Sequence, residues 1–405
     1  MGGVLMNSSA ARLAMLLLLF AVTAKAQTWQ KLPVNGQLFS PPTWPSERGY
    51  TRLVYDPVKQ QHLYMSAENL CNVYTNALWG YNAAKNTFTM LTWSGSFPNH
   101  RICNTPAAPD TATYPGDRHP YHTQIYDTLR SRLVIYSGAE ALENCQGTGH
   151  GICNFPDTYH YFSSSGVVST PGLGWTQDCG LNANLPACAP GTRQEGAMTY
   201  DGVQDLIVLY GALQHGTGTS DTWVYAGGPN TWSKVTTLCS GANCVANACG
   251  KGCNSLGQRA GHSMVYDPLN RKVVLFGGYV VGAGIENDTW IYDTPSGTWT
   301  ESKSVRPPAV KYPAMAFDTK RGIIWLHTGL GNPGGDDWTY NVATDTWTHM
   351  TSITGGPVPK SQDKGYIAQN TLTMDYDPVL DSLIATADDA TDITKMWQIS
   401  LVNIP

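Results

Sequence analysis

Residues 259–299 read RAGHSMVYDPLNRKVVLFGGYVVGAGIENDTWIYDTPSGTW and contain four short segments rich in β-branched and aromatic residues. Each segment is bounded by Gly, Pro, Asn or Asp, which is typical of short strands joined by tight turns. The segments are Val265-Tyr266-Asp267-Pro268, Val273–Phe276 followed by Gly277-Gly278, Asp288–Tyr292, and Thr298-Trp299. The stretch therefore predicts one unit of four short antiparallel strands.

The same order of segments recurs along the chain. An aromatic residue followed by Asp occurs at six corners, Tyr55-Asp56, Tyr126-Asp127, Tyr200-Asp201, Tyr266-Asp267, Phe317-Asp318 and Tyr376-Asp377. An apolar run follows each corner, at His62–Met65, Leu133–Tyr136, Leu206–Tyr210, Val273–Phe276, Ile323–Leu326 and Leu383–Ala385. Self-similarity of this kind is the signature of a repeat architecture, so the sequence predicts six units.

This pattern resembles the kelch motif, in which an aromatic-Asp turn and an apolar strand ending in Gly-Gly precede paired Trp or Tyr residues on the outer strands. The resemblance covers nearly all of residues 27–405, although Ala67 and Ala387 stand where Gly-Gly would be in the first and last units. It implies an all-β fold, a six-bladed kelch-type β-propeller similar to the central domain of galactose oxidase.

The sixth unit has three predicted strands and lacks the Thr-Trp segment of the other outer strands. A matching segment, Thr28-Trp29, is present at the other end of the chain. An open propeller would leave an unpaired sheet edge, and pairing of this segment beside Trp397 would remove it. We therefore predict that an N-terminal strand joins the last blade and closes the ring. The alternative is that Trp29 belongs only to an ordered terminus.

The first 26 residues have the features of a signal peptide. Arg12 precedes the apolar run Leu13–Ala24, and Ala24-Lys25-Ala26 forms a small-residue cleavage site before Gln27. The run is too short to span a bilayer, and a buried N-terminal helix is the alternative. We therefore expect residues 1–26 to be removed and residues 27–405 to form one secreted domain, extracellular or periplasmic, without membrane insertion.

Composition limits the partners of this domain. Charged residues make up 14% of the chain, and abundant aromatics argue against a disordered polymer. Loss of Arg12 and Lys25 with the signal peptide would change the net charge from −5 to −7, because no acid is removed with them. A negative domain is a poor nucleic-acid binder, so we expect no nucleic-acid partner and a monomeric protein.

All ten cysteines lie in the long connections that leave one face of the predicted units: Cys71, Cys103, Cys145, Cys153, Cys179, Cys188, Cys239, Cys244, Cys249 and Cys253. In an exported chain they imply disulfides. Short spacing favours Cys145–Cys153 and Cys179–Cys188, and Cys71–Cys103 would join neighbouring loops. The last four cysteines allow three connectivities. The bridges could shape a binding face, or they could only protect the insertions from proteolysis.

Basic and histidine side chains precede the corners and are candidates for ligand binding at the mouth of a central channel. They are Arg48, Arg118, His119, His122, Arg193, Arg259, His262 and Lys311. A ring of cations would favour an anionic ligand such as a carboxylate or an acidic sugar. The alternative, which we favour, is that each Arg pairs with an Asp of an adjacent blade. No third ligand accompanies His119 and His122, so we expect no metal and no cofactor.

Three classes of function remain. The first, which we favour, is a recognition module that holds a glycan or an extracellular protein on the disulfide-linked loop face. The second is a carbohydrate-active enzyme of the kelch propeller type, mutarotase-like or oxidase-like, but the adjacent His pair of the oxidases is missing. The third is a purely structural propeller. Fold alone does not choose among them, and no residue is assigned a catalytic role.

Overall fold

The computed structural model describes residues 27–33, 51–65, 77–92, 115, 118–142, 151–154, 157–165, 174–180, 188–214, 217–235, 238–239, 256–329, 336–358, 372–388, 394–402 and 404. The backbone alone is described for residues 139–142, 151–154, 165, 214, 217, 238–239, 388 and 394. The predicted signal peptide and Arg48 lie outside the described residues.

The described residues form an all-β fold, as the sequence predicted, with one short 3-10 turn, η3 (Ser163–Ser165). The first sheet contains β3 (Val54–Asp56), β4 (Gln61–Met65), β5 (Leu78–Asn82) and β6 (Thr87–Thr92). The second contains β7 (Gln124–Asp127), β8 (Arg132–Tyr136), β11 (Thr158–Phe162) and β12 (Trp175–Cys179). The third contains β13 (Ala197–Asp201), β14 (Leu206–Gln214), β15 (Thr217–Ala226) and β16 (Thr231–Val235).

Three further sheets follow the same antiparallel order. The fourth contains β19 (Ser263–Asp267), β20 (Lys272–Phe276), β23 (Thr289–Asp293) and β24 (Thr298–Glu301), with β17 (Leu238–Cys239) added in parallel at its edge. The fifth contains β25 (Ala314–Asp318), β26 (Ile323–His327), β27 (Asp337–Asn341) and β28 (Thr346–His349). The sixth contains β30 (Thr373–Asp377), β31 (Ser382–Asp388), β32 (Thr394–Ser400) and β2 (Gln30–Lys31).

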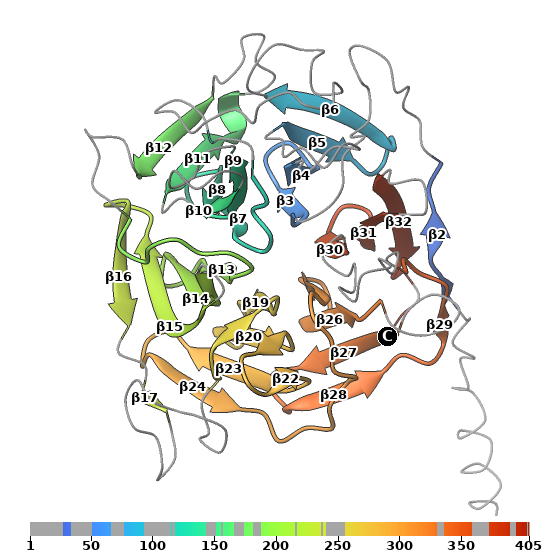
Figure 1. Ribbon diagram of the computed structural model, residues 1–405. Coiled ribbons are helices and arrows are strands. Elements are labelled where there is room, and N and C mark those ends of the chain that lie inside the picture. Colours follow the sequence, from blue (N-terminus) through green and yellow to red (C-terminus); the bar gives the residue numbers. More distant parts are fainter. Residues whose placement is uncertain are drawn as a thin grey trace, which may run out of the picture.

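The sheets stand around a common axis, with the first strand of each nearest to it (Figure 1). These innermost strands contact one another in the order β3, β7, β13, β19, β25 and β30, and β30 contacts β3 again. The buried side chains lie between neighbouring sheets. One such cluster, for example, joins Val54 and Leu63 of the first sheet to Tyr126, Leu133 and other residues of the second.

The aromatic-Asp corners form the turns between the first and second strands of each sheet. In the fourth sheet, Asp267 Oδ1 accepts hydrogen bonds from the backbone N–H groups of Leu269 (2.9 Å) and Asn270 (3.1 Å), which is the Asx-turn geometry that favours Asp there. In all six turns, the residue five positions after the aromatic has a left-handed backbone, with φ between 47° and 68°. These residues are Gln60, Ser131, Asp205, Arg271, Gly322 and Asp381. The repeated corner is therefore a turn signal.

Tryptophans of the outer strands join neighbouring sheets by hydrogen bonds. The indole Nε1 of Trp232 donates to Thr158 Oγ1 (2.9 Å) of the preceding sheet. Trp299 donates in the same way to Thr222 (3.0 Å), and Trp347 to Thr289 (2.9 Å). Because these indoles are almost fully buried, the bonds satisfy groups that would otherwise be costly to bury.

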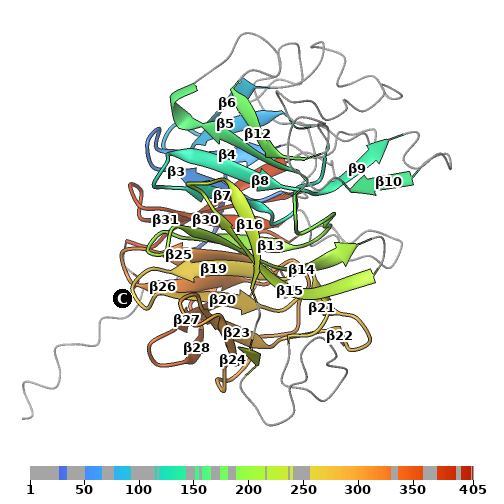
Figure 2. The ribbon, with the colours of Figure 1, turned by 90° about the vertical axis from the view of Figure 1, so that its left-hand side faces the viewer.

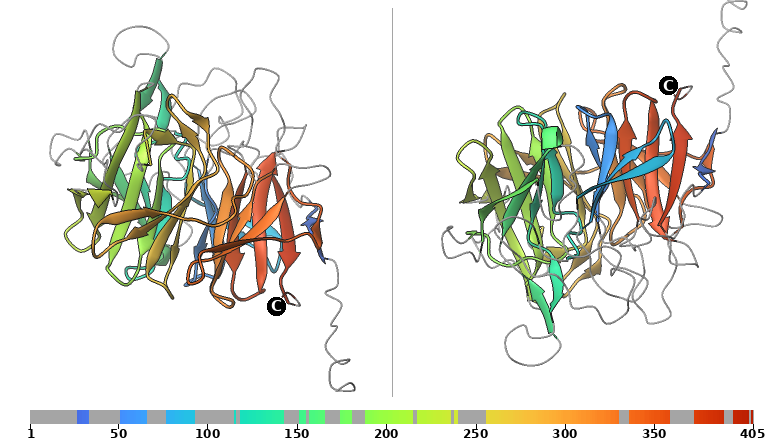
Figure 3. Two further views of the ribbon diagram at one scale, coloured as in Figure 1. Left: turned by 90° about the horizontal axis from the view of Figure 1, so that it is seen from below. Right: turned by 90° about the horizontal axis from the view of Figure 1, so that it is seen from above.

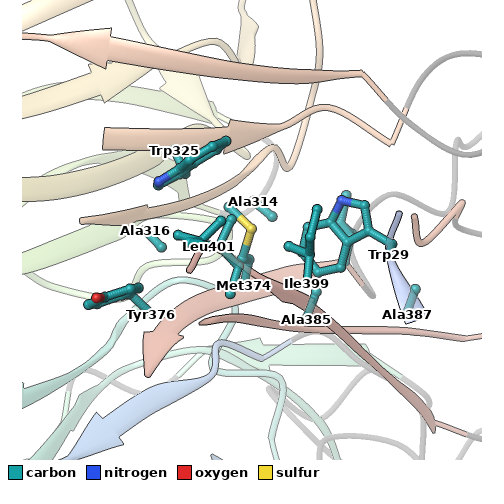
Figure 4. Close-up of a cluster of buried hydrophobic side chains, with 12 residues drawn as sticks. Trp29, Ala314, Ala316, Trp325, Met374, Tyr376, Ala385, Ala387, Ile399 and Leu401 are labelled. Carbon is teal, nitrogen blue, oxygen red and sulfur yellow. The ribbon is translucent and has the colours of Figure 1, made fainter. Parts of the chain in front are cut away.

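The N-terminal segment lies against the sixth sheet. β2 pairs antiparallel with β32, with Lys31 opposite Trp397, and β1 (Gln27–Thr28) pairs in parallel with β29 (Ile353–Thr354). Trp29, between β1 and β2, is 3% exposed. Figure 4 shows its indole among Ile399, Ala385 and other apolar side chains of the sixth sheet.

The two faces of the ring differ. Hairpin β9 (Ala139–Leu142)–β10 (Gly151–Asn154), the ends of β14 and β15, and hairpin β21 (Tyr279–Val280)–β22 (Gly284–Ile285) extend from one face, which we call the loop face (Figure 2). The green β9–β10 hairpin stands out from the ring in both views of Figure 3. The short corner turns form the opposite face, which we call the turn face.

One predicted disulfide, Cys179–Cys188, is confirmed. The structure describes no side chain for Cys153 or Cys239, which lie on β10 and β17. The other predicted disulfide positions, Cys71, Cys103, Cys145, Cys244, Cys249 and Cys253, lie outside the described residues.

Candidate functional site

Three of the predicted ligand-binding arginines form buried, forked ion pairs. Arg118 binds Asp157 through two bonds of 2.6 and 3.0 Å, and Arg193 binds Asp221 at 2.6 and 2.9 Å. Arg259 binds Asp288 at 2.6 and 2.5 Å. The three arginine side chains are only 1–2% exposed, so their charges are matched inside the protein.

The expectation that each Arg would pair with an Asp of an adjacent unit is wrong for these three arginines, because each binds an Asp of its own repeat unit. Arg259 Nη1 also donates to the backbone carbonyl of Gly277 (2.6 Å), which follows β20, the second strand of the fourth sheet. This contact brings the guanidinium beside Asp288, which immediately precedes the third strand. Burial alone would raise the pKa of Asp288, but the bonds from Arg259 outweigh it and the net pKa is lowered. Each pair therefore holds the end of the second strand of a unit close to the start of its third strand.

The predicted histidines are buried near the loop face. His119, His122 and His262 are at most 6% exposed, and His122 Nδ1 lies 3.0 Å from the carbonyl oxygen of His262. Burial lowers the pKa of His122 to about 4 and those of His119 and His262 well below the ordinary value. At neutral pH these rings are uncharged, so they do not contribute to a ring of cations.

Lys311 is also paired. Its Nζ lies 2.8 Å from Glu195 Oε2 and 4.6 Å from the ring centroid of Tyr312. Tyr312 in turn stacks on Tyr121, with ring centroids 6.2 Å apart. The structure thus places the Lys311 ammonium in contact with a carboxylate and a tyrosine ring.

Four residues at one repeat position just before the innermost strands have left-handed backbones: Tyr121 (φ 52°), Glu195 (φ 59°), Gly261 (φ 62°) and Tyr312 (φ 57°). Three of them are not glycine, so the conformation is unfavourable for them. The conformation is used in main-chain bonding between sheets, because Gly261 N–H donates to Glu195 O (2.8 Å) and Tyr312 N–H to Gly261 O (2.6 Å). These bonds link the third, fourth and fifth sheets around the axis.

An axial cavity of about 420 Å³ lies at the turn-face end of the innermost strands. Its wall includes all six corner aromatics, Tyr55, Tyr126, Tyr200, Tyr266, Phe317 and Tyr376. Its rim is formed by the residue two positions after each aromatic, namely Pro57, Thr128, Gly202, Pro268, Thr319 and Pro378, all of them exposed. The cavity is therefore open to solvent on the turn face and has a mostly apolar wall.

Two charged residues in this cavity depart from the repeat. Arg52 occupies a position held in the other innermost strands by Thr123, Ala197, Ser263, Ala314 and Thr373. Asp375 occupies a position held in the others by Val54, Ile125, Thr199, Val265 and Ala316. Both residues line the cavity, so the charge is concentrated where the sequence repeat is broken.

Arg52 reaches from the first sheet to the third. Its Nη1 donates to the backbone carbonyl of Met198 at 3.0 Å, and its own carbonyl accepts a bond from Gln124. Burial lowers the pKa of Arg52, and attraction to Asp375 opposes the shift. Met198 O is the one hydrogen-bond acceptor that the described residues offer this guanidinium.

Asp375 is held by the backbone and lies near a histidine. Its carboxylate accepts bonds from the N–H groups of Tyr55 (2.6 Å) and Tyr376 (2.9 Å), and Oδ2 lies 3.9 Å from His62 Nδ1. Burial raises the pKa of Asp375, and His62 and Arg52 oppose the shift. The side chain remains 23% exposed, so one part of the carboxylate is reachable from the cavity.

This site was not predicted from the sequence, because each aromatic-Asp corner by itself indicates only a turn. A signal was present: the six repeats, aligned on the corner aromatic, differ in charge at only a few inner positions, and Arg52 and Asp375 are two of them. In the part of the chain that the structure describes, no group of three His, Cys, Asp or Glu side chains could hold a metal ion.

Comparisons with known proteins give limited information. No family model matches the chain. A segment of 119 residues is 29% identical to Mei4-dependent protein 6 of Schizosaccharomyces pombe, covering 25% of this chain and 16% of that protein. The chain thus spans about a sixth of the length of this relative. Within the described ranges, no helix has the length and apolar character needed to cross a membrane.

Proposed function

We propose that the chain is an exported six-bladed propeller of the kelch type, closed by its N-terminal strand. The innermost strands contact one another in a closed cycle, which supports a ring of six sheets. The pairing of β2 with β32 supports closure by the N-terminal segment, because β2 supplies the outer strand that the sixth sheet would otherwise lack. The Cys179–Cys188 bridge supports export, since such bonds persist in oxidising compartments. Residues 1–26 would be the signal peptide.

We further propose that the protein is a recognition module that binds an extracellular protein through its loop face. The observation that carries this proposal is the hairpin β21–β22, on which Tyr279, Val281 and Ile285 are 39–41% exposed. Neighbouring apolar side chains at one exposed site are typical of interaction surfaces. The hairpin extends from the ring beside the ends of β14 and β15 (Figure 2).

This hairpin is held in one conformation before any partner binds. The N–H of Val281 donates to Gln258 O (2.9 Å), that of Ala283 to Val280 O (3.0 Å), and that of Glu286 to Gly278 O (2.9 Å). Preorganised segments lose little conformational entropy on association. Two of the exposed residues are aliphatic, and these offer nothing to the hydroxyl groups of a sugar. The hairpin therefore favours a protein over a glycan.

The proposal is tested with the triple variant Tyr279→Ser/Val281→Ser/Ile285→Ser. The double variant Leu129→Ser/Leu269→Ser, on exposed turn-face positions, is the matched control. Each protein, together with the wild type, is immobilised and exposed to proteins released by host cells, and a retained protein is purified for affinity measurement. Loss of three apolar contacts of about 1 kcal/mol each predicts at least a tenfold weaker Kd for the triple variant alone.

Two outcomes would contradict the proposal. The purified partner could bind the wild type and the triple variant with the same Kd, which would remove the hairpin from the interface. Alternatively, a glycan array could show a saturable glycan ligand lost in the triple variant, which would make the loop face a carbohydrate site.

A further inference from the structure

The axial cavity has no part in the proposed loop-face interaction. It opens on the turn face, and its lining runs from Arg52 at the inner end to Pro57 at the rim. A cavity of about 420 Å³ is in the size range of small-molecule sites.

The wall of the cavity suits an apolar body. The six corner aromatics, together with Val54, Ile125 and Val265, are among the residues that line it. Aromatic walls bind flat or branched apolar groups by burying their surface. Selectivity must then come from the few polar groups that converge on the space.

Two opposite charges face this cavity without contacting each other. Arg52 and Asp375 form no ion pair within 4 Å among the described residues, although they attract each other. The Arg52 guanidinium has one protein acceptor, Met198 O, among the described residues. Among the described basic side chains, the His62 imidazole lies within 4 Å of Asp375, with its Nδ1 3.9 Å from Oδ2. Each charge therefore has unused capacity to bind a complementary group of a ligand.

A ligand with a single charge leaves the other side chain unmatched. An anion at Arg52 would be repelled by Asp375, and a cation at Asp375 would be repelled by Arg52. In a partly desolvated site such repulsions are larger than in water. A molecule that carries a carboxylate and an ammonium close together satisfies both side chains at once.

We propose that the axial cavity binds a small zwitterion with a large apolar group, an α-amino acid of the phenylalanine type. Its carboxylate accepts hydrogen bonds from Arg52, its ammonium donates to Asp375, and its side chain lies against the corner aromatics. Forked bonds from a guanidinium to a carboxylate give this arrangement both strength and orientation.

The first test uses ligands only and needs no variant. Calorimetry or saturation-transfer NMR compares L-phenylalanine with phenethylamine, which lacks the carboxylate, with 3-phenylpropionate, which lacks the ammonium, and with glycine, which lacks the apolar group. L-phenylalanine is expected to bind most tightly, and each of the others at least about tenfold more weakly, because each loses one charged hydrogen bond or the apolar contact.

The second test separates the two charges. Arg52→Gln is expected to weaken L-phenylalanine at least about tenfold and to leave phenethylamine unchanged or tighter. Asp375→Asn is expected to weaken L-phenylalanine and to leave 3-phenylpropionate unchanged or tighter. Arg306→Gln, at an exposed surface pair with Glu301, is the matched control and should bind as the wild type does.

The proposal is overturned if L-phenylalanine shows no saturable binding to the folded wild type. It is also overturned if a singly charged analogue binds as tightly as L-phenylalanine, or if Arg52→Gln and Asp375→Asn weaken all ligands alike. Unchanged partner binding on the loop face in these variants would show that the two sites are independent.

Discussion

The indole Nε1 of Trp29 donates a hydrogen bond to Asp337 Oδ2 at 3.1 Å, across 308 positions of sequence. Asp337 begins the third strand of the preceding sheet. Trp347 makes the equivalent bond to Thr289, which begins the third strand of the sheet before its own. Trp29 packs in one buried cluster with Ile399 of β32, and Trp347 lies opposite Tyr340 of β27. Trp29 thus takes the position of an outer-strand tryptophan in the sixth sheet.

We expect Trp29→Ala to lower the free energy of unfolding by about 3–5 kcal/mol, because it empties a buried site and removes the bond to Asp337. Trp29→Phe keeps most of the packing and should cost about 1 kcal/mol through the lost donor. Urea denaturation measures both values. Lys31→Ala, on the exposed side of the same segment, is the control, and an equal loss in Trp29→Ala and Lys31→Ala would refute the assignment.

Asp337, which accepts the bond from Trp29, also lies beside His327, and this second contact predicts a pH dependence of stability. His327 Nδ1 lies 2.9 Å from Asp337 Oδ1 and its Nε2 lies 2.9 Å from Pro357 O, so both nitrogens face acceptors. Burial lowers the pKa of His327, but Asp337 and the carbonyl outweigh burial and the net pKa is raised. A raised folded-state pKa gives stability that is complete below the unfolded value of about 6.5 and is lost as pH rises through the folded pKa.

We therefore expect the urea midpoint to fall as the pH rises above about 6.5, and His327→Gln to remove most of this fall. Denaturation at several pH values from weakly acidic to weakly alkaline measures it. A midpoint that rises with pH in this range, or that falls equally in His327→Gln, would show that the buried imidazole is neutral.

The ion pair of Arg259 and Asp288 should contribute to stability mainly as a unit. Arg259→Ala leaves a buried, uncompensated carboxylate and is expected to cost about 3–5 kcal/mol. Adding Asp288→Ala should recover part of this loss. Arg306→Ala at an exposed pair is the control and should cost less than about 1 kcal/mol. Additive effects of the two substitutions in a double-mutant cycle would contradict the pairing.

The corner turns offer a stabilising substitution. Arg271 is exposed and has a φ of 55°, and Gly322 holds the same turn position in the fifth sheet. Arg271→Gly should raise the free energy of unfolding by about 1 kcal/mol, and Gly322→Ala should lower it by a similar amount. Thermal unfolding measures both, and a destabilised Arg271→Gly variant would show that the left-handed turn is wrongly assigned.

The sequence predicted the elements whose cause is local. The corner at Tyr266-Asp267 encodes its own turn, and the close spacing of Cys179 and Cys188 limited the choice of partner. Contacts set by three-dimensional neighbours were harder to predict. Arg259 lies next to Asp288 because the backbone after the second strand brings both to one end of the sheet, and sequence alone offered an adjacent sheet equally well.

The axial cavity was missed for a related reason. A repeat is recognised by what its units share, such as the aromatic corners, whereas this site depends on two residues that depart from the repeat. Arg52 and Asp375 come from opposite ends of the sequence and line one cavity only because the first and last sheets are neighbours around the axis. That adjacency depends on the long-range arrangement of the sheets.

Hydrogen exchange followed by mass spectrometry tests most directly whether the chain forms a ring completed by its N-terminal strand. In that arrangement several amide hydrogens of residues 27–32 are bonded to β29 or β32, for instance Trp29 N–H to Thr354 O (3.0 Å) and Leu32 N–H to Met396 O (2.9 Å). We predict that a peptide covering these residues exchanges as slowly as one covering β28, and that Trp29→Ala accelerates it. Exchange at the rate of an unstructured peptide in the wild type would contradict the closed ring.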